Sequence, residues 1–286
     1  MSELSEDHSL SNEEAISENL ESWRFFAHVH ARGDGKEFYR IDELIAGACS
    51  LPPWEVEEFG DVSGKTLLHL QCHIGTDTLS WARRGAQVTG LDFAPEAIEE
   101  ANLLAQMMGI EDARFVCGRV EQADEVLGGE QFDIVTTGRG ALCWLPDLDA
   151  WARACSAVTA PGGRLHLEEA TPSLMMLDLK DGALTPHFDQ FGHRRSSETS
   201  TGSYAAPEHP EIRRTHCWEY RYDLIINALV NHGFVIERLT EREELPWTPW
   251  PDVFEPSRPG FWKLKAGFPR IPLSFTLIAR KMQSMA

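Results

Sequence analysis

Basic residues are scarce in this sequence of 286 residues. Lys and Arg together number 26 against 45 Asp and Glu, which gives a formal net charge of −19. A charge of that sign repels the phosphates of nucleic acids and the headgroups of anionic lipids. We therefore expect neither nucleic acid nor a membrane surface as a partner.

Long apolar runs and a leader segment are also lacking. No run approaches the roughly 20 apolar residues that cross a bilayer. The N-terminus begins with the acids Glu3, Glu6 and Asp7 rather than with a basic region followed by an apolar stretch. This pattern does not indicate a signal peptide, and we expect a cytoplasmic protein.

Cysteine pairs with the spacing of metal or redox sites are absent. The six cysteines include no C-x-x-C, and no Cys and His residues have zinc-finger spacing. Residues 187–193 contain two histidines without a third ligand at a suitable spacing. The pattern indicates a reduced intracellular protein with free thiols, and we predict no metal site.

Alternating apolar runs and amphipathic helical stretches begin at Lys65. This alternation is typical of βαβ units around a parallel sheet, and the length fits one large domain or a core with an elaborated region. We expect helices over residues 76–85, 95–108, 148–158 and 222–232 and a turn at 161–163. We expect strands over residues 66–70, 87–91, 113–117, 132–136, 164–168, 234–239 and 273–279.

The regions on either side of this pattern have a different character. Ser11 and Glu14 form a capping-box pattern that predicts a helix from there towards Gly33, and a second helical stretch covers residues 38–48 before Pro52-Pro53 closes the cap. Residues 211–220 alternate weakly, as a strand does. Residues 245–272 contain three Trp and seven Pro, which is too aromatic for a flexible linker. We expect that segment to act as a lid or as a homodimer contact.

The exit of the first expected strand is the place to look for a ligand site. In an open, doubly wound sheet, ligands bind beyond the carboxyl ends of the strands. Gly75 would let the backbone approach a ligand at a helix N-terminus. Asp92 ends the second strand, 17 residues later, where an acid accepts hydrogen bonds from ribose hydroxyls. The alternative is that Asp92 only caps the helix that follows it.

At these positions the sequence resembles the class I S-adenosylmethionine-dependent methyltransferases. The resemblance covers about residues 65–281, and HLQCHIG is similar to a small-molecule-type subgroup in which His and Gln replace common motif residues. It implies an α/β fold with a Rossmann-like, doubly wound sheet of seven strands, the last antiparallel. The motifs that carry it are LLHLQCHIG (67–75), VTGLDFAPEAIEEA (88–101), FDIVTT (132–137), LCWLPD (142–147), the PGG turn and SFTLIARK (274–281).

The same resemblance divides the chain into three parts. Residues 1–60 would form an acidic tail and a helical cap. Residues 61–170 would form the cofactor-binding core. Residues 171–286 would complete the sheet and carry lid or substrate insertions at 171–221 and 245–272.

Departures from the family pattern occur at the strand exits. The family has an acid at the place of His69 and glycines at those of Gln71 and His73, so only Gly75 remains of three glycines. Side chains at these two positions lie beside the expected cofactor. Arg119 stands where an acid often holds the adenine amino group, and a guanidinium accepts no hydrogen bond. Backbone groups near Arg119 and Val120, or stacking by the guanidinium, would then recognise adenine.

The resemblance also implies the remaining contacts of S-adenosylmethionine and of its product S-adenosylhomocysteine. The methionine part would face the backbone of residues 71–75, which include Cys72. Trp23 and Phe26 would cover the cofactor, although core packing is the favoured interpretation for both. Arg139 lies near the methionine end, and pairing with an acid is favoured for it. The other expected contacts are Phe93 for adenine, Thr137 and Gly138 for the sulfonium side, and Trp144 for the substrate wall, where ordinary core packing is an equal alternative.

Methyl transfer needs alignment and exclusion of water more than a dedicated catalytic group. The candidate bases, each more readily explained as a structural or solvated residue, are His28, His30, Glu168, Glu169 and His216. Of these, Glu168 and Glu169 at the fifth strand's exit have the best position.

Three functions remain open at this stage. The leading one is an S-adenosylmethionine-dependent methyltransferase for a neutral or cationic small molecule. The second is a catalytically inactive sensor or partner subunit that binds the same cofactor, since two glycines are missing. The third, a nicotinamide-dependent oxidoreductase, is opposed by the absent G-x-G-x-x-G and by the seventh strand's pattern.

Overall fold

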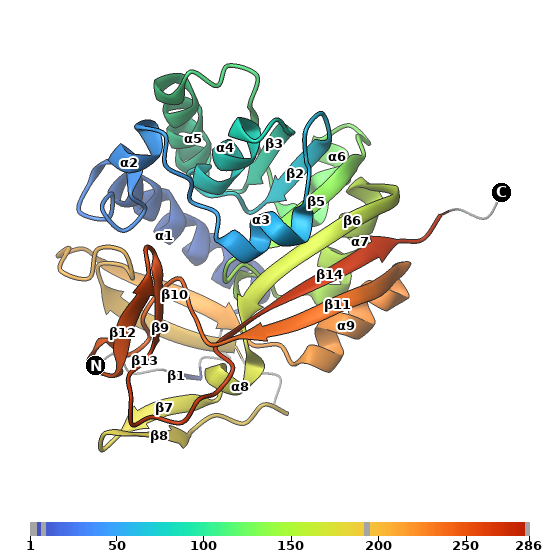
Figure 1. Cartoon of the computed structure of the whole chain (residues 1–286). Coiled ribbons are helices and arrows are strands. Elements are labelled where there is room, and N and C mark those ends of the chain that lie inside the picture. The colour runs from blue at the N-terminus through green and yellow to red at the C-terminus, as the bar shows by residue number, and fades with distance from the viewer. Residues whose placement is uncertain (1–4, 7–9, 192–194, 284–286) are drawn as a thin grey trace.

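A seven-stranded mixed sheet forms the centre of the computed structural model, which describes residues 5–6, 10–191 and 195–283 (Figure 1). The strand order is β11-β14-β6-β5-β2-β3-β4. Strands β2 to β6 pair in parallel, and β14 runs antiparallel to both β6 and β11. The expected Rossmann-like α/β fold is therefore confirmed. The strands are β2 (Thr66–Leu70), β3 (Gln87–Asp92), β4 (Arg114–Cys117), β5 (Phe132–Gly138), β6 (Thr159–Ala170), β11 (Phe234–Arg242) and β14 (Ser274–Lys281).

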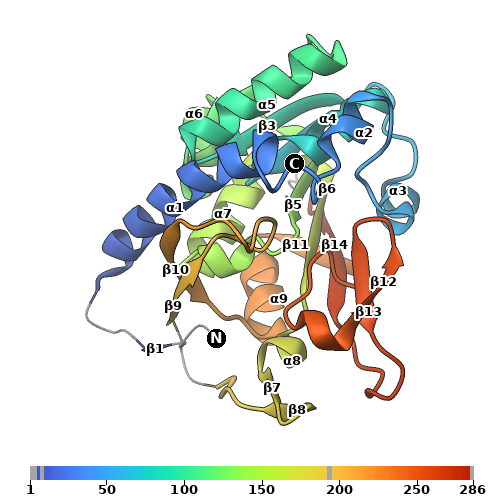
Figure 2. The same cartoon turned by 90° about the vertical axis from the view of Figure 1, so that its left-hand side faces the viewer.

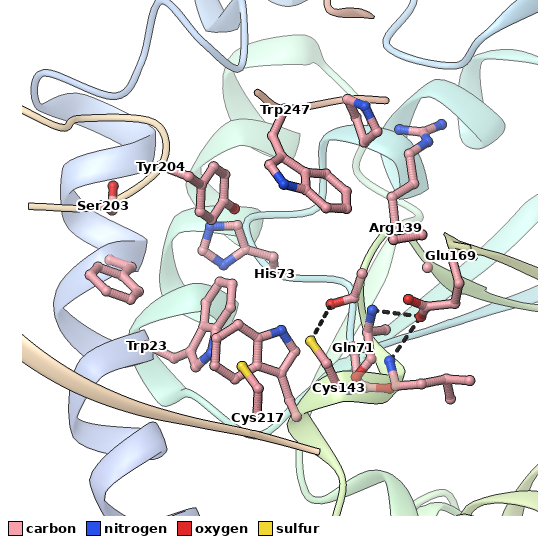
Figure 3. A pocket seen from close by; sticks show the side chains of 18 of the residues that line it. Trp23, Gln71, His73, Arg139, Cys143, Glu169, Ser203, Tyr204, Cys217 and Trp247 are labelled. Atoms are coloured by element: carbon pink, nitrogen blue, oxygen red, sulfur yellow. Dashed lines mark hydrogen bonds between the residues drawn. The ribbon is translucent and has the colours of Figure 1, made fainter. Parts of the chain in front are cut away.

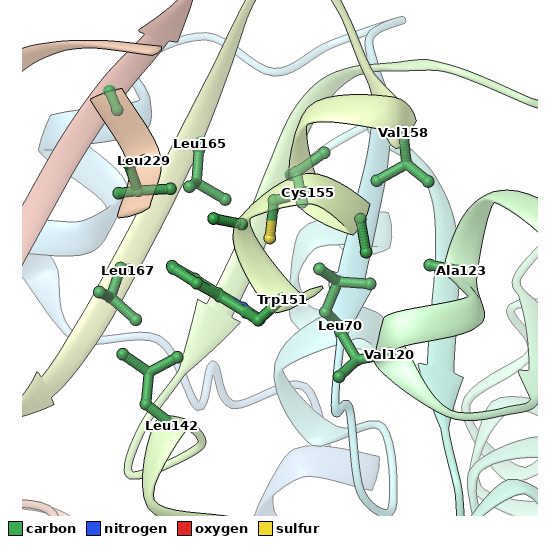
Figure 4. Close-up of a cluster of buried hydrophobic side chains, with 14 of the residues drawn as sticks. Leu70, Val120, Ala123, Leu142, Trp151, Cys155, Val158, Leu165, Leu167 and Leu229 are labelled. Atoms are coloured by element: carbon green, nitrogen blue, oxygen red, sulfur yellow. The ribbon is translucent and has the colours of Figure 1, made fainter. Parts of the chain in front are cut away.

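Helices cover both faces of this sheet because successive strand residues point to opposite sides. Leu70 packs in a buried cluster around Trp151 of α7 (Figure 4). Leu67 points to the other face and packs with Trp81 of α4. The helices around the sheet are α3 (Pro53–Phe59), α4 (Thr76–Arg83), α5 (Pro95–Met108), η1 (Val120–Gln122), α6 (Ala123–Val126), η2 (Leu142–Trp144), α7 (Leu148–Val158) and α9 (Tyr222–Asn231).

The N-terminal cap agrees with the sequence in one helix and differs in two. Helix α1 (Asn12–Arg32) begins with the predicted capping box, in which the N–H of Ser11 donates to Glu14 at 2.7 Å. The helix expected over 38–48 is only α2 (Ile41–Ile45), because Arg40 before it has a left-handed φ of 53°. Pro53 does not close the cap. It is the first residue of α3, where a missing N–H is tolerated.

The turn expected at residues 161–163 lies inside a strand. β6 starts at Thr159, earlier than the expected residue 164, and runs through the Pro-Gly-Gly sequence. Its pairing with β5 shifts register there, from Phe132 opposite Thr159 to Ile134 opposite Arg164. The segment is thus an irregularity near the start of β6 rather than a reversal of the chain.

Small sheets gather at one end of the large sheet (Figures 1 and 2). Helix α1 is joined to β10 because the Asn19 amide bonds both the N–H and the C=O of His216, each at 2.8 Å. No helix in the described ranges has the length and apolarity to cross a bilayer. The elements here are β1 (Ser5–Glu6), α8 (Pro172–Met175), β7 (Leu177–Lys180), β8 (Ala183–Pro186), β9 (Arg195–Thr201), β10 (Ile212–Trp218), η3 (Pro251–Val253), β12 (Phe254–Arg258) and β13 (Phe261–Leu264).

Candidate functional site

A cavity of about 670 Å³ lies beyond the carboxyl ends of β2, β3, β5 and β6. Its other walls come from α1, β10 and the segment that leads into β12 and β13. The cavity therefore occupies the position where a doubly wound sheet binds its ligands. Figure 3 shows the labelled side chains around it.

The loop that leaves β2 has a left-handed backbone at three alternate residues. Gln71, His73 and Gly75 have φ values of 56°, 51° and 77°. A side chain at Gly75 would clash with the ring of Phe115. Gln71 and His73 thus adopt the backbone that glycine adopts freely, at a cost of about 1 kcal/mol each.

The side chains at these two positions are attached to opposite walls. The amide of Gln71 donates to the carbonyl of Ala141 at 2.9 Å, after β5. Nε2 of His73 lies 2.8 Å from Nδ1 of His30 on α1. Figure 3 shows His73 beside Tyr204 and Gln71 beside Cys143. Both side chains line the cavity, and each is hydrogen-bonded to another part of the chain at its wall.

His30 and His73 belong to a short buried hydrogen-bonded chain. Nε2 of His30 lies 2.9 Å from the hydroxyl of Ser203, and Nδ1 of His73 is buried with no partner in the described part of the chain. Burial lowers the pKa of His73 to about 3 and lowers that of His30 well below its usual range. Both rings are therefore neutral, and Nδ1 of His73 remains available to a ligand.

Asp92, at the end of β3, is buried and lines the cavity. One carboxylate oxygen accepts the N–H of His73 at 2.8 Å, and the other accepts the N–H of Ala94 at 2.9 Å. The second bond holds the turn into α5, which is the structural role that the sequence offered as an alternative. Burial raises the pKa of Asp92 to about 6. Each oxygen keeps a further lone pair for a hydroxyl donor.

Aromatic rings form the wall on the α1 side. Trp23 contacts both Trp144 and His73 edge to face, with ring centroids 5.1 Å apart in each pair. Phe26 is buried and stacks on His30 at 5.6 Å. Trp23, Phe26, Phe93 and Trp144 all line the cavity. Such rings attract a cation through their faces.

Arg139 is the centre of a buried ionic cluster. Its guanidinium pairs with Glu55 at 2.5 Å, Asp77 at 2.8 Å and Glu168 at 3.2 Å. The pairing with acids that the sequence favoured is therefore observed. Burial disfavours the guanidinium charge, but the three carboxylates outweigh it and raise the pKa of Arg139. Burial also raises the pKa of Glu168, although Arg139 opposes that shift.

Glu169 lies next to this cluster and lines the cavity from the end of β6. Its Oε1 accepts the backbone N–H of Ala141 at 2.7 Å and that of Leu142 at 2.8 Å. Burial raises the pKa of Glu169 to about 7. The two amides orient this carboxyl, so it is the candidate base with both a fixed position and access to the cavity.

The other predicted residues lie in several places. Cys72 and Gly138 line the cavity, and buried Thr137 donates to Gln71 Oε1 at 3.4 Å. Outside the lining, Arg119 pairs with Glu13 at 2.9 Å, and Val120 belongs to the hydrophobic core.

Among the candidate histidines, His28 is exposed and pairs with Glu100, whereas His216 is buried between Ser197 and Glu18. Neither lines the cavity. His193 lies outside the described residues. Within the described ranges, no three His, Cys, Asp or Glu side chains are grouped to hold a metal ion.

Sequence reasoning missed several residues of the site. Asp77 follows Gly75 by two positions and could have been found from that spacing. Glu55 lies on α3, which was not predicted. Tyr39, Tyr204 and Cys217 come from segments without a motif, and only the folded chain brings them to the cavity.

Comparisons with known proteins find methyltransferases among the similar sequences and structures. Residues 67–163 match a family model described as a methyltransferase domain. A ubiquinone biosynthesis O-methyltransferase of Xanthomonas oryzae pv. oryzae is 37% identical over 122 residues, which cover 41% of this chain and 48% of that protein. The chain thus spans about half the length of the curated relatives it matches.

Solved structures share the fold at low sequence identity. An S-adenosylmethionine-dependent methyltransferase from Mesorhizobium loti is 18% identical with a TM-score of 0.56, covering 83% of this chain and 100% of that one. A 1,6-didemethyltoxoflavin-N1-methyltransferase from Burkholderia thailandensis is 18% identical with a TM-score of 0.54, covering 99% and 96%. The fold of this chain is that of the methyltransferases.

Proposed function

We propose that this protein is an S-adenosylmethionine-dependent methyltransferase that acts on a small molecule. The observation that carries the proposal is Asp92, which ends β3, lines the cavity and is bonded to the loop leaving β2. A carboxylate in that place is suited to the two hydroxyls of an adenosyl ribose. The match of residues 67–163 to a methyltransferase domain supports the same assignment.

The residues present fit this cofactor. Gln71 and His73 replace two glycines, yet each keeps the left-handed backbone and is tied to a wall. Nδ1 of His73 is a buried polar atom that lacks a partner in the described part of the chain, as expected of an atom that meets a ligand. Trp23 and Trp144 line the cavity, where the face of an aromatic ring attracts a cation.

When bound, S-adenosylmethionine supplies a methyl group on a positively charged sulfur. Asp92 would hold the ribose, Phe93 would pack on the adenine, and the backbone of residues 71–75 would face the methionine part. Thr137 and Gly138 would lie at the sulfonium side, and Trp144 would form a wall of the substrate pocket. Arg119 and Val120 have no part in this proposal because neither lines the cavity.

The main alternative is a protein that binds the cofactor without transferring its methyl group. Gln71 and His73 favour this alternative, because their left-handed backbone is strained and their side chains take up space in the site. Calorimetric titration with S-adenosylmethionine, S-adenosylhomocysteine and NAD tests binding. Transfer of a labelled methyl group to a panel of amines, phenols and thiols then separates enzyme from sensor. Binding of NAD alone would overturn both.

Two further assignments belong to the proposal. We expect a cytoplasmic protein, since all six cysteines are free thiols. Residues 245–272 contact the body of the chain, as Trp262 stacks on Phe38 at 5.7 Å and Phe261 meets Trp54 at 4.9 Å. These contacts favour a lid over a homodimer contact. An oligomeric state that stays the same when the segment is deleted would exclude the dimer role.

A further inference from the structure

The part of the cavity beyond β5 and β6 has one carboxyl fixed at its wall. Glu169 is oriented through Oε1 by the N–H groups of Ala141 and Leu142. Trp144 and Trp247 line the same cavity, and Figure 3 shows Trp247 and Glu169 around one space. The residues proposed to hold the ribose and the adenine of the cofactor lie instead at β2 and β3. Glu169 therefore belongs to the region left for a methyl acceptor.

The cations of the cavity are already neutralised. Among the residues that the structure describes, the guanidiniums that line it belong to Arg40, Arg139 and Arg221, and each pairs with at least one carboxylate of the chain. Arg139 alone serves three acids. An anionic acceptor would therefore meet guanidiniums that are each already paired with a carboxylate.

Among the described residues that line the cavity, the acids by contrast exceed the cations. Glu169 and Asp92 are held by backbone N–H groups. Oε1 of Glu168, a side chain buried beside Glu169, lacks a partner in the described part of the chain. A buried anionic excess stabilises a positive charge brought next to it and destabilises a negative one.

This difference separates two classes of acceptor. A phenol must lose its proton and become an anion before or during transfer, which the neighbouring carboxylates oppose. An amine nitrogen becomes positive as it takes the methyl group, which they favour. Aromatic walls add a further preference for a cationic nitrogen.

We propose, building on the proposed function, that the acceptor is a primary or secondary amine whose nitrogen and transferable proton are received by Glu169. The bound ammonium first gives one proton to the Glu169 carboxylate, which frees the lone pair of the nitrogen. The lone pair forms the new N–C bond while the C–S bond of the sulfonium breaks and its electron pair stays on sulfur. The products are the positively charged methylated amine, a neutral thioether and a protonated Glu169 carboxyl.

The ionisation of Glu169 agrees with this role. Burial raises its pKa to about 7, with Glu168 of the same strand adding to the shift and the N–H groups of residues 140–142 opposing it. A carboxyl of that pKa is available near neutral pH both to pair with an ammonium group and to take a proton.

Three probes of one skeleton and different charge test the proposal by calorimetry. They are 2-phenylethylamine, 2-phenylethanol and phenylacetate, titrated into the protein alone and with S-adenosylhomocysteine present. We expect the amine to bind at least about tenfold tighter than the alcohol and phenylacetate to bind weakest. In Glu169→Gln the preference should fall below about threefold, with the affinity for S-adenosylhomocysteine unchanged.

Glu169→Gln is suited to this test because both backbone bonds go to Oε1, an oxygen that glutamine retains. Glu100→Gln is the matched control, since Glu100 is equally buried but does not line the cavity. It should keep the preference for the amine. If Glu169→Gln does not fold, the proposal is tested by whether the wild-type protein binds the amine more tightly than the alcohol.

The outcomes are distinguishable. Binding of S-adenosylhomocysteine without a preference for the amine, or a preference that survives in Glu169→Gln, overturns the amine acceptor and leaves the proposed function intact. Tighter binding of the alcohol assigns a hydroxyl acceptor and also overturns the proposal. No binding of S-adenosylhomocysteine to the wild type overturns the proposed function, and the assignment of an acceptor falls with it.

Discussion

The backbone N–H of His73 donates to a carboxylate oxygen of Asp92 at 2.8 Å. This bond joins the loop leaving β2 to the end of β3, so the two parts expected to hold one adenosyl ligand are fixed to each other. The left-handed φ of His73 turns its N–H in that direction while its ring reaches α1. A histidine thus takes the backbone place of a glycine and adds a contact that glycine cannot make.

The left-handed conformation of His73 predicts an unusual order of stability for two small substitutes. His73→Gly and His73→Ala both remove the imidazole, but only alanine retains the cost of a φ of 51°. We expect His73→Gly to be more stable than His73→Ala by about 1 kcal/mol in urea unfolding. At the exposed helical residue Glu99 the order should reverse, with glycine less stable by about 1 kcal/mol. Equal stability at residue 73 would contradict the strained loop.

Glu169 should make the stability of the protein depend on pH. Its pKa is about 7 in the folded state against an ordinary value of 4.5, so the folded state binds this proton more tightly than the unfolded state. The resulting penalty is absent below the lower value, grows as pH rises, and is complete above the upper value at no more than about 3 kcal/mol.

Glu169→Gln removes that ionisation while keeping the two backbone bonds. Relative to wild type, the variant should gain about 2 kcal/mol of unfolding free energy between pH 5 and pH 8. Urea unfolding of both proteins at the two pH values measures the gain. If the difference in unfolding free energy between the variant and wild type is the same at both pH values, the pKa of Glu169 is not raised in the folded protein.

Arg139 should be among the most sensitive positions of the chain. Arg139→Gln leaves Glu55, Asp77 and Glu168 buried without their shared cation, which should cost about 3–5 kcal/mol. Arg139→Lys keeps the charge but not the fork of donors, so it should lose less. Arg270, an exposed residue paired with Glu243, is the control, and its substitution should not change stability measurably. A small loss for Arg139→Gln would show that the acids are protonated in the folded state.

Much of the fold follows from local sequence signals. Apolar runs placed all seven strands, with each start within one residue of the prediction except that of β6, which begins five residues earlier. Ser11 and Glu14 placed the start of α1 through a local hydrogen-bonding pattern. The errors came where backbone conformation overrides composition: Arg40 interrupts a helical pattern with a positive φ, and Pro53 starts a helix rather than ending one.

The site was less accessible to sequence reasoning. Asp92 was predictable because it ends a strand, and an acidic partner for Arg139 followed from the charge balance. The left-handed backbone of Gln71 and His73 was not predictable, because the identity of a side chain gives no sign of the φ of its residue. Their wall contacts also depend on Ala141 and His30, which are 70 and 43 residues away along the chain. Only the folded chain reveals such pairs.

Binding of S-adenosylhomocysteine to wild type and to Asp92→Ala, measured by isothermal titration calorimetry, tests the central claim most directly. Asp92→Ala removes a buried charge but leaves the N–H groups of His73 and Ala94 without their acceptor, so circular dichroism checks its fold, and Glu99→Ala serves as an exposed control. We predict micromolar binding to wild type and to the control, and binding at least about tenfold weaker to Asp92→Ala. No binding to wild type, or equal affinity in Asp92→Ala, would contradict the assignment of this cavity to the cofactor.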